Sequence, residues 1–209
     1  MYPKTLKRAL DLCTCLLAAP FLLPLGILLA VLIRLDSHGS VFFIQPRAGK
    51  DGSIFPLVKF RTLVEDVDQV AHGERMQSFI RGEAETLGPG RATFKPFDAD
   101  QVTRVGAVLR RTSLDELPQF FNVIAGDMSL VGPRPNVCKE VEAYEPWHCG
   151  RLAALPGITG LAQVRGRSAV SFDEIVRNDL EYIEKQSLRL DLKILWWTFA
   201  TVLCGAGAE

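Results

Sequence analysis

The sequence lacks the residue patterns of a zinc protein or of a disulfide-stabilised secreted domain. Its five cysteines are odd in number and form no C-x-x-C pair. The histidines, His38, His72 and His148, are too widely spaced to supply a zinc ligand set. These features predict a reduced protein that faces the cytosol and has no disulfide framework.

An excess of charge of either sign is also missing, because 24 lysines and arginines balance 24 aspartates and glutamates. A neutral chain provides no global field that would favour nucleic acid or an acidic partner. Basic stripes interleaved with aromatic residues and helix-turn-helix spacing are absent too, so we predict no nucleic-acid binding. Without an internal repeat, a low-complexity tract or a linker, the 209 residues suit a single domain.

Hydrophobic residues are concentrated near the two termini, and the longest apolar run covers Leu12 to Ile33. As a straight helix it would be about 33 Å long, against about 30 Å of bilayer hydrocarbon. Positive charges flank both ends, so the positive-inside bias selects no outer end. Pro20 and Pro24 lie within the run and favour a bend. From these residues alone, a spanning helix and a re-entrant helix that enters and leaves on one face stay equally open.

The rest of the chain predicts a mixed domain with short strands and more extensive helices. A polar stretch at 65–100, with several glycines and prolines, predicts a mobile insertion that contains a short helix at Glu74–Ile80. Near the C-terminus, Trp196 and Trp197 fit either the headgroup zone of a membrane or a protein core. The predicted strands are Ser40–Ile44 and Ile54–Thr62, and the predicted helices are Val102–Arg111, Asp115–Ala125, Phe172–Ile183 and Leu192–Cys204.

Two adjacent acids stand out in the middle of the chain, within Ser113-Leu-Asp-Glu-Leu-Pro-Gln119. Ser113 and Glu116 have the spacing of a capping box, which would place Asp115 and Glu116 in the first turn of a helix. Pro118 removes an early helix hydrogen bond, so the regular helix could instead begin near Pro118. Such acids are either ordinary caps or, beside a phosphate, a nucleophile and metal ligands.

Cations that could bind a diphosphate occur on both sides of the acid pair. Arg134 stands between two prolines, which stiffen the backbone that directs its guanidinium. Lys59, Arg110 and Arg167 are further candidates, since managing phosphate charge requires such groups, although a single cation of this kind is more often a solvated surface residue. A loop that contains three glycines could approach a ligand closely or could simply turn. These glycines are Gly157, Gly160 and Gly166.

Three motifs resemble the bacterial sugar transferase family, whose members are small monotopic phosphoglycosyl transferases. The motifs are Ser113–Gln119, Gly126–Pro135 and Pro156–Arg167, and the resemblance extends from about Lys7 to Leu203. It implies a membrane-associated α+β, mainly helical single domain with interfacial amphipathic helices. A re-entrant membrane helix with its flanks would occupy residues 1–38, with Pro20 and Pro24 at the bend, and a catalytic domain would occupy 39–209. Family members usually have Ser-Pro at the bend, where this chain has Leu23-Pro24.

The resemblance also implies a reaction and its participants. Asp115 would attack the phosphorus next to the sugar of a UDP-sugar, release UMP and carry the phosphosugar. Polyprenyl phosphate would then accept it, giving polyprenyl diphosphosugar. Asp115 and Glu116 would hold Mg²⁺. The residues expected to bind substrate are Lys59, Arg110, Arg134, Gln163 and Arg167.

The expected location is the cytoplasmic face of the bacterial inner membrane, where a soluble donor and a lipid acceptor in the bilayer can meet. The pathway would be exopolysaccharide, O-antigen, capsule or glycoprotein synthesis. Two alternatives are a membrane-anchored nucleotide-sugar hydrolase and a non-catalytic anchor for an assembly complex. The intact Asp115-Glu116 pair argues against the anchor, which needs neither acid. The sugar stays open, as does assembly into a homodimer.

Overall fold

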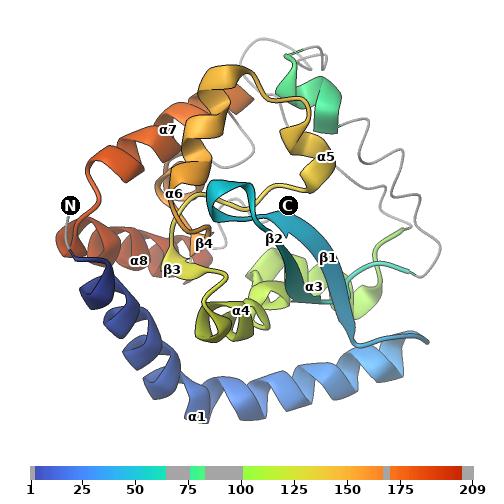
Figure 1. Cartoon of the computed structure of the whole chain (residues 1–209). Helices are drawn as coiled ribbons and strands as arrows, with labels where there is room; N and C mark the ends of the chain where they lie inside the picture. Colours follow the sequence, from blue (N-terminus) through green and yellow to red (C-terminus); the bar gives the residue numbers. More distant parts are fainter. Residues whose placement is uncertain (1–2, 65–75, 83–100, 167–169, 204–209) are drawn as a thin grey trace.

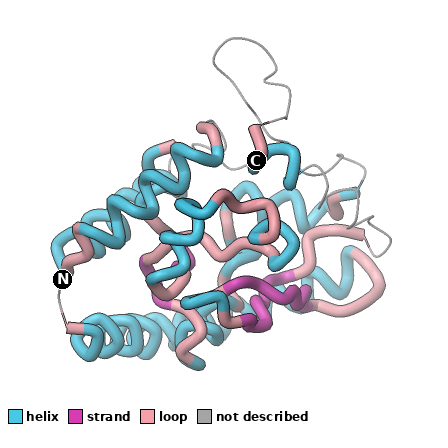
Figure 2. The backbone as a smooth tube through the Cα atoms, turned by 45° about the horizontal axis from the view of Figure 1, so that its top comes forward, coloured by secondary structure: helices cyan, strands magenta, loops and turns pink. Residues whose placement is uncertain are grey.

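The computed structural model describes residues 3–64, 76–82, 101–166 and 170–203. Figure 1 shows a mainly helical body with a long N-terminal helix along one side, and Figure 2 shows how short the strands are. The mainly helical α+β prediction is therefore confirmed. Arg167 and most of the predicted insertion at 65–100 lie outside the described residues, whereas residues 76–80 are helical as predicted. The four described cysteines, Cys13, Cys15, Cys138 and Cys149, are free thiols.

The larger elements follow one another with short connections within each described stretch. The first half of the chain contains α1 (Lys4–Asp36), β1 (Phe42–Ala48), β2 (Ile54–Phe60) and α3 (Arg104–Thr112). The second half contains α4 (Gln119–Ala125), β3 (Ser129–Val131), α5 (Cys138–Val141), β4 (Gly157–Thr159), α6 (Leu161–Arg165), α7 (Phe172–Glu184) and α8 (Leu188–Leu203). Short 3-10 segments are η1 (Lys50–Gly52), η3 (Leu114–Glu116) and η4 (Pro146–Ala153).

Helix α1 contains the predicted apolar run and is continuous through Pro20 and Pro24. Figure 1 shows it bent part-way along its length, as expected for a helix with two internal prolines. Among the described residues one helix, Thr5–Asp36, is long and apolar enough to cross a membrane, and 11% of its most apolar window is buried in the protein. Side chains such as Leu16 and Phe21 are therefore exposed.

The N-terminal part of α1 is fastened to the body by polar contacts. The Lys7 ammonium lies 2.7 Å from the Asp191 carboxylate of α8 and also donates to the Tyr182 hydroxyl of α7. One turn later, buried Asp11 accepts a hydrogen bond from the backbone N–H of Leu130 in β3, at 3.1 Å. This part of the helix is thus docked on α7, α8 and β3, three of the elements that contribute residues to the main core.

The C-terminal end of α1 is fastened to the body as well. Asp36 accepts a hydrogen bond of 2.8 Å from the backbone N–H of Val105, at the start of α3. The Arg61 guanidinium, just after β2, donates to the carbonyls of Ser37 and His38. Both ends of the bent helix therefore contact one globular body, a long-range arrangement that the sequence pattern alone does not contain.

Strands β1 and β2 form an antiparallel pair that confirms the two predicted strands, with slightly shifted ends. Asn122 of α4 locks this pair in place, since its side chain accepts from the Val58 N–H at 3.1 Å and donates to the Pro56 carbonyl at 2.7 Å. A buried amide satisfied by backbone groups fixes the relative position of two elements. Lys59 is consequently held next to the chain segment that leads into α4.

Strands β3 and β4 form a short parallel pair, and their backbone passes very close to that of the adjoining residues. A Cβ added to Gly157 would lie 2.1 Å from the Gly132 nitrogen, and one added to Gly160 would lie 2.3 Å from the Gly132 carbonyl oxygen. Glycine is required here because backbone meets backbone. The close approach at Gly157 and Gly160 is thus to the chain itself rather than to a ligand.

The two C-terminal helices are confirmed, and the paired tryptophans separate in their roles. Ser171 caps α7, its hydroxyl accepting from the Glu174 N–H at 3.3 Å. On α8, Trp197 packs against the core, whereas Trp196 is 68% exposed. The headgroup-zone and core interpretations therefore each fit one tryptophan.

Candidate active site

The two acids lie on a single 3-10 turn rather than in the first turn of a regular helix. Ser113 ends α3 with a left-handed φ of 56°, and its side chain caps nothing in the following turn. An N-cap residue needs extended backbone, so Ser113 cannot end one helix in this way and also cap the next. The predicted capping box is wrong, and the alternative start near Pro118 is confirmed, because α4 begins at Gln119.

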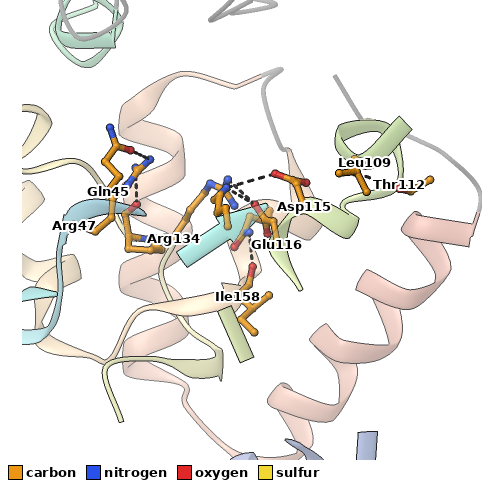
Figure 3. A network of polar contacts seen from close by, with 11 residues as sticks. Gln45, Arg47, Leu109, Thr112, Asp115, Glu116, Arg134 and Ile158 are labelled. Atoms are coloured by element: carbon orange, nitrogen blue, oxygen red, sulfur yellow. Dashed lines mark hydrogen bonds and ion pairs between the residues drawn. The ribbon is translucent and has the colours of Figure 1, made fainter. Parts of the chain in front are cut away.

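Lys59 and Arg134 converge on the acid pair from different parts of the chain. Glu116 Oε1 accepts hydrogen bonds from Lys59 Nζ at 3.0 Å and from Arg134 Nη2 at 2.8 Å. The Lys59 ammonium also lies 3.9 Å from Asp115 Oδ2. Figure 3 shows these contacts, with Arg134 next to Glu116. Three of these side chains are mostly buried, while that of Arg134 is 48% exposed, so the cluster opens to solvent through the arginine.

The neighbouring acids differ in how completely their charge is compensated. Burial alone would raise the pKa of Glu116, but the charges and hydrogen bonds of Arg134 and Lys59 outweigh it and lower this pKa to about 2. For Asp115, burial dominates and raises the pKa, although Lys59 acts in the opposite direction. Glu116 is thus ionised and holds the two cations in place by hydrogen bonds. The charge of Asp115 is less completely compensated by neighbouring cations.

The loop that carries Arg134 is clamped by two arginines that sequence reasoning missed, the buried Arg151 and the half-buried Arg47. Arg151 donates to the Arg134 carbonyl at 3.1 Å, and Arg47 donates to the Pro135 carbonyl, also at 3.1 Å. Arg151 is held in turn by an ion pair of 2.6 Å with Asp179 of α7. The flanking prolines are therefore one part of the support, and long-range guanidinium contacts are the other.

The remaining predicted substrate-binding residues lie at different distances from this cluster. Burial lowers the pKa of Arg110 while the charge of Asp115 opposes that shift, so Arg110 lies within electrostatic reach of Asp115. Gln163 of α6 donates to the Ile158 carbonyl of β4 at 3.0 Å, a local contact that does not join it to the acids. Arg167 is outside the described residues.

The donor set suits magnesium only in combination with a substrate. Within the described residues, no group of three or more histidine, cysteine or acidic side chains gathers as a metal cage. Magnesium, however, commonly binds to one or two carboxylates while substrate phosphates and water complete its octahedron. Asp115 and Glu116 provide such a pair beside the two cations Lys59 and Arg134. The site therefore fits Mg²⁺ that is bound together with a diphosphate.

The sequence profile described as bacterial sugar transferase matches residues 2–205. The chain belongs to this family. It is 40% identical over 202 residues to the exopolysaccharide production protein ExoY of Sinorhizobium fredii, covering 97% of this chain and 87% of that protein.

Two other relatives carry names that state a reaction. The UDP-glucose:undecaprenyl-phosphate glucose-1-phosphate transferase of Caulobacter vibrioides is 40% identical over 207 residues, covering 94% of this chain and 69% of that protein. The undecaprenyl-phosphate galactose phosphotransferase of Salmonella typhimurium is 37% identical over 203 residues, and this chain spans 41% of its length. The predicted enzyme class, a sugar-phosphate transferase, is confirmed by the family and by these relatives.

Proposed function

We propose that this enzyme transfers a phosphosugar from a UDP-sugar to undecaprenyl phosphate, giving undecaprenyl diphosphosugar and UMP, as the first membrane step of exopolysaccharide synthesis. The observation that carries the proposal is the Asp115-Glu116 pair held against Lys59 and Arg134. The named activities of the Caulobacter and Salmonella relatives supply the substrate classes.

In the first step, an Asp115 carboxylate oxygen attacks the phosphorus that bears the sugar. A new P–O bond forms to Asp115 while the bond to UMP breaks, and UMP leaves with that electron pair. The assignment to Asp115 rests on its weaker charge compensation, since Glu116 is already paired with two cations. Nucleophilic carboxylates are established in phosphoryl transfer, and they divide one difficult displacement into two.

In the second step, a phosphate oxygen of undecaprenyl phosphate attacks the same phosphorus. The bond between Asp115 and phosphorus breaks, which restores the carboxylate and completes a ping-pong cycle. Lys59 and Arg134 would bind the phosphate oxygens throughout, and Glu116 keeps both cations in position before substrate arrives. Asp115 and Glu116 would also hold Mg²⁺, which when bound neutralises diphosphate charge.

The proposed location is the cytoplasmic face of the inner membrane, with α1 as a re-entrant element. This topology is supported by the attachment of both helix ends to one body, through Lys7 and Asp11 at one end and Asp36 at the other. The exposed apolar side chains between those ends, such as Leu16 and Phe21, would contact lipid. A site at this interface can meet a soluble donor and a lipid acceptor.

The direct test is a transfer assay on membranes that contain the enzyme, with undecaprenyl phosphate and a panel of UDP-sugars. We expect UMP release together with a lipid-linked phosphosugar for at least one donor, and neither product from the Asp115→Asn variant. Release of UMP over many catalytic cycles without the lipid acceptor would instead identify a nucleotide-sugar hydrolase. An absence of UMP release with every donor would favour a non-catalytic anchor.

A further inference from the structure

Gln119 has a buried polar side chain that has no role in the proposed transfer reaction. It is the first residue of α4, it is 2% exposed, and its Nε2 atom makes no hydrogen bond within the described residues. Native proteins pair most buried donors, because an unpaired one loses its hydration without compensation. An unpaired amide at such a position therefore indicates a partner that arrives from outside the chain.

The recess that Gln119 lines is strongly basic and adjoins the acid pair. Besides Gln119 its lining consists of Arg47, Leu57, Lys59, Arg134 and Pro135. Three of the six lining residues are cations, none is an acid, and Glu116 pairs with Lys59 and Arg134 at its edge. Figure 3 shows Arg47, Arg134 and Glu116 in this region. The lining favours an anion rich in oxygen acceptors.

The fold holds Gln119 in this recess independently of any local hydrogen bond. Asn122 lies three residues later, so both side chains are on one face of α4. The Asn122 amide is fixed to the backbone of β2 at Pro56 and Val58, one residue before Lys59. Gln119 is consequently presented to the strand that carries Lys59, and its orientation does not depend on a partner of its own.

We propose that Gln119 is a substrate-binding residue whose side-chain amide donates a hydrogen bond to a phosphate oxygen seated in this recess, beside Lys59 and Arg134. The inference rests on the proposed function and extends it to one further group. An amide supplies a directional donor without adding a fourth cation to the recess. The phosphate belongs either to the nucleotide-sugar donor or to the lipid acceptor, and the two half-reactions distinguish these sources.

The test compares the full-length enzyme in detergent with its Gln119→Met variant. Methionine has nearly the same length and shape but has no N–H donor, and burying it removes an unsatisfied amide. We therefore expect an unchanged or higher melting temperature together with a loss of about 10- to 150-fold in kcat/KM. Gln186→Leu is the matched control, since Gln186 donates to the Tyr182 hydroxyl away from the recess, and it should keep wild-type kinetics.

Two further readouts identify the phosphate. In Gln119→Met, slower formation of the Asp115 phosphosugar adduct with UDP-sugar alone, and a smaller UMP-induced rise in melting temperature than in the wild type, would assign Gln119 to the donor phosphate. Normal adduct formation with slow transfer to undecaprenyl phosphate would assign it to the lipid phosphate. Wild-type rates in both half-reactions, or a lowered melting temperature that accounts for the lost activity, would overturn the inference. If the wild-type enzyme itself transfers nothing, the proposed function fails, and the UMP-induced stabilisation still decides whether Gln119 binds the phosphate of a nucleotide.

Discussion

Two clusters of buried charge lie close together in this enzyme, and they are built differently. In the first, Arg151 and Asp179 pair at 2.6 Å with both side chains 2% exposed, and Arg151 also donates to the Tyr144 hydroxyl. In the second, Glu116 takes hydrogen bonds from Lys59 and Arg134, yet Arg134 is half-exposed and Asp115 is 3.9 Å from its cation. One cluster is closed, and the other is open.

This difference indicates that the closed cluster stabilises the fold and that the open cluster is available for the reaction. A closed pair deep in the protein can only hold elements together, and Arg151 does this by binding the Arg134 carbonyl. An open cluster keeps charge available for a ligand, here two cations and an incompletely compensated carboxylate. Substitutions in the closed cluster should therefore reduce stability, whereas substitutions in the open cluster should reduce turnover at nearly constant stability.

The largest expected effect is that of Asp115→Asn in the open cluster. An amide of nearly the same shape is a poor nucleophile, so transfer should be abolished while the melting temperature stays close to wild type. Assays of UMP release and thermal unfolding on the same preparation check both statements. Substantial turnover in this variant would contradict the nucleophilic role.

Removing divalent metal should have an effect of similar size. A carboxylate can attack a diphosphate only when the negative charge of the diphosphate is neutralised. Activity should therefore vanish with EDTA and return on adding magnesium. Without substrate, EDTA should change the melting temperature little, because the magnesium site is complete only when substrate phosphates join the two acids. Transfer that continues at full rate in EDTA would remove magnesium from the mechanism.

In the closed cluster, Asp179→Asn should mainly destabilise the fold. Removing one partner leaves the Arg151 charge buried and uncompensated, which typically costs about 3–5 kcal/mol. Urea unfolding of the variant and of Asp115→Asn, compared side by side, measures this contrast. Equal unfolding free energies for the two variants would contradict the division between closed and open clusters.

A smaller effect is expected at Arg134, where the open cluster meets solvent. Loss of a charge-assisted contact to phosphate costs about 1.5–3 kcal/mol, so Arg134→Ala should lose at least about tenfold in kcat/KM. Arg134→Lys should recover little, because lysine lacks the planar fork of the guanidinium. Steady-state kinetics of both variants are the measurement, and a near-wild-type Arg134→Ala enzyme would show that the arginine is structural.

The smallest effect on activity is expected at the bend of α1. Pro24→Ala should straighten the helix and lower transfer, since the site would lose its position relative to the lipid acceptor. Topology can be measured separately, by introducing single cysteines at positions 2 and 52 in a background that lacks the native cysteines. A re-entrant helix predicts that both sites are protected from an impermeant reagent in intact cells. Labelling at position 2 alone would mean that the helix spans the membrane.

The sequence predicted the open cluster better than the closed one. Asp115, Glu116 and Arg134 lie in long motifs, so their local pattern indicated a common role, and the structure brings them together with Lys59. Asp179 lies within an apolar helical pattern, and its pairing with Arg151 depends on how α7 packs against distant segments. The helical spacing of apolar residues around Asp179 does not indicate which distant residue it pairs with.

Local rules also failed where two elements compete for one residue. Ser113 has the right spacing to cap a helix at Glu116, but it already ends α3 in a left-handed conformation. Gln119 was overlooked although it lies in the same motif as the acids, because its unusual property is burial without a partner. Burial and pairing are properties of the folded chain, and a motif alone does not report them.

The most direct test of the account is the intact mass of the enzyme after incubation with a UDP-sugar in the absence of lipid acceptor. The account predicts an added mass of one phosphosugar on the wild-type chain, lost on adding undecaprenyl phosphate and absent from Asp115→Asn. An unmodified wild-type chain under conditions that support full transfer, or an equally modified Asp115→Asn chain, would contradict the assignment of Asp115 as the covalent nucleophile.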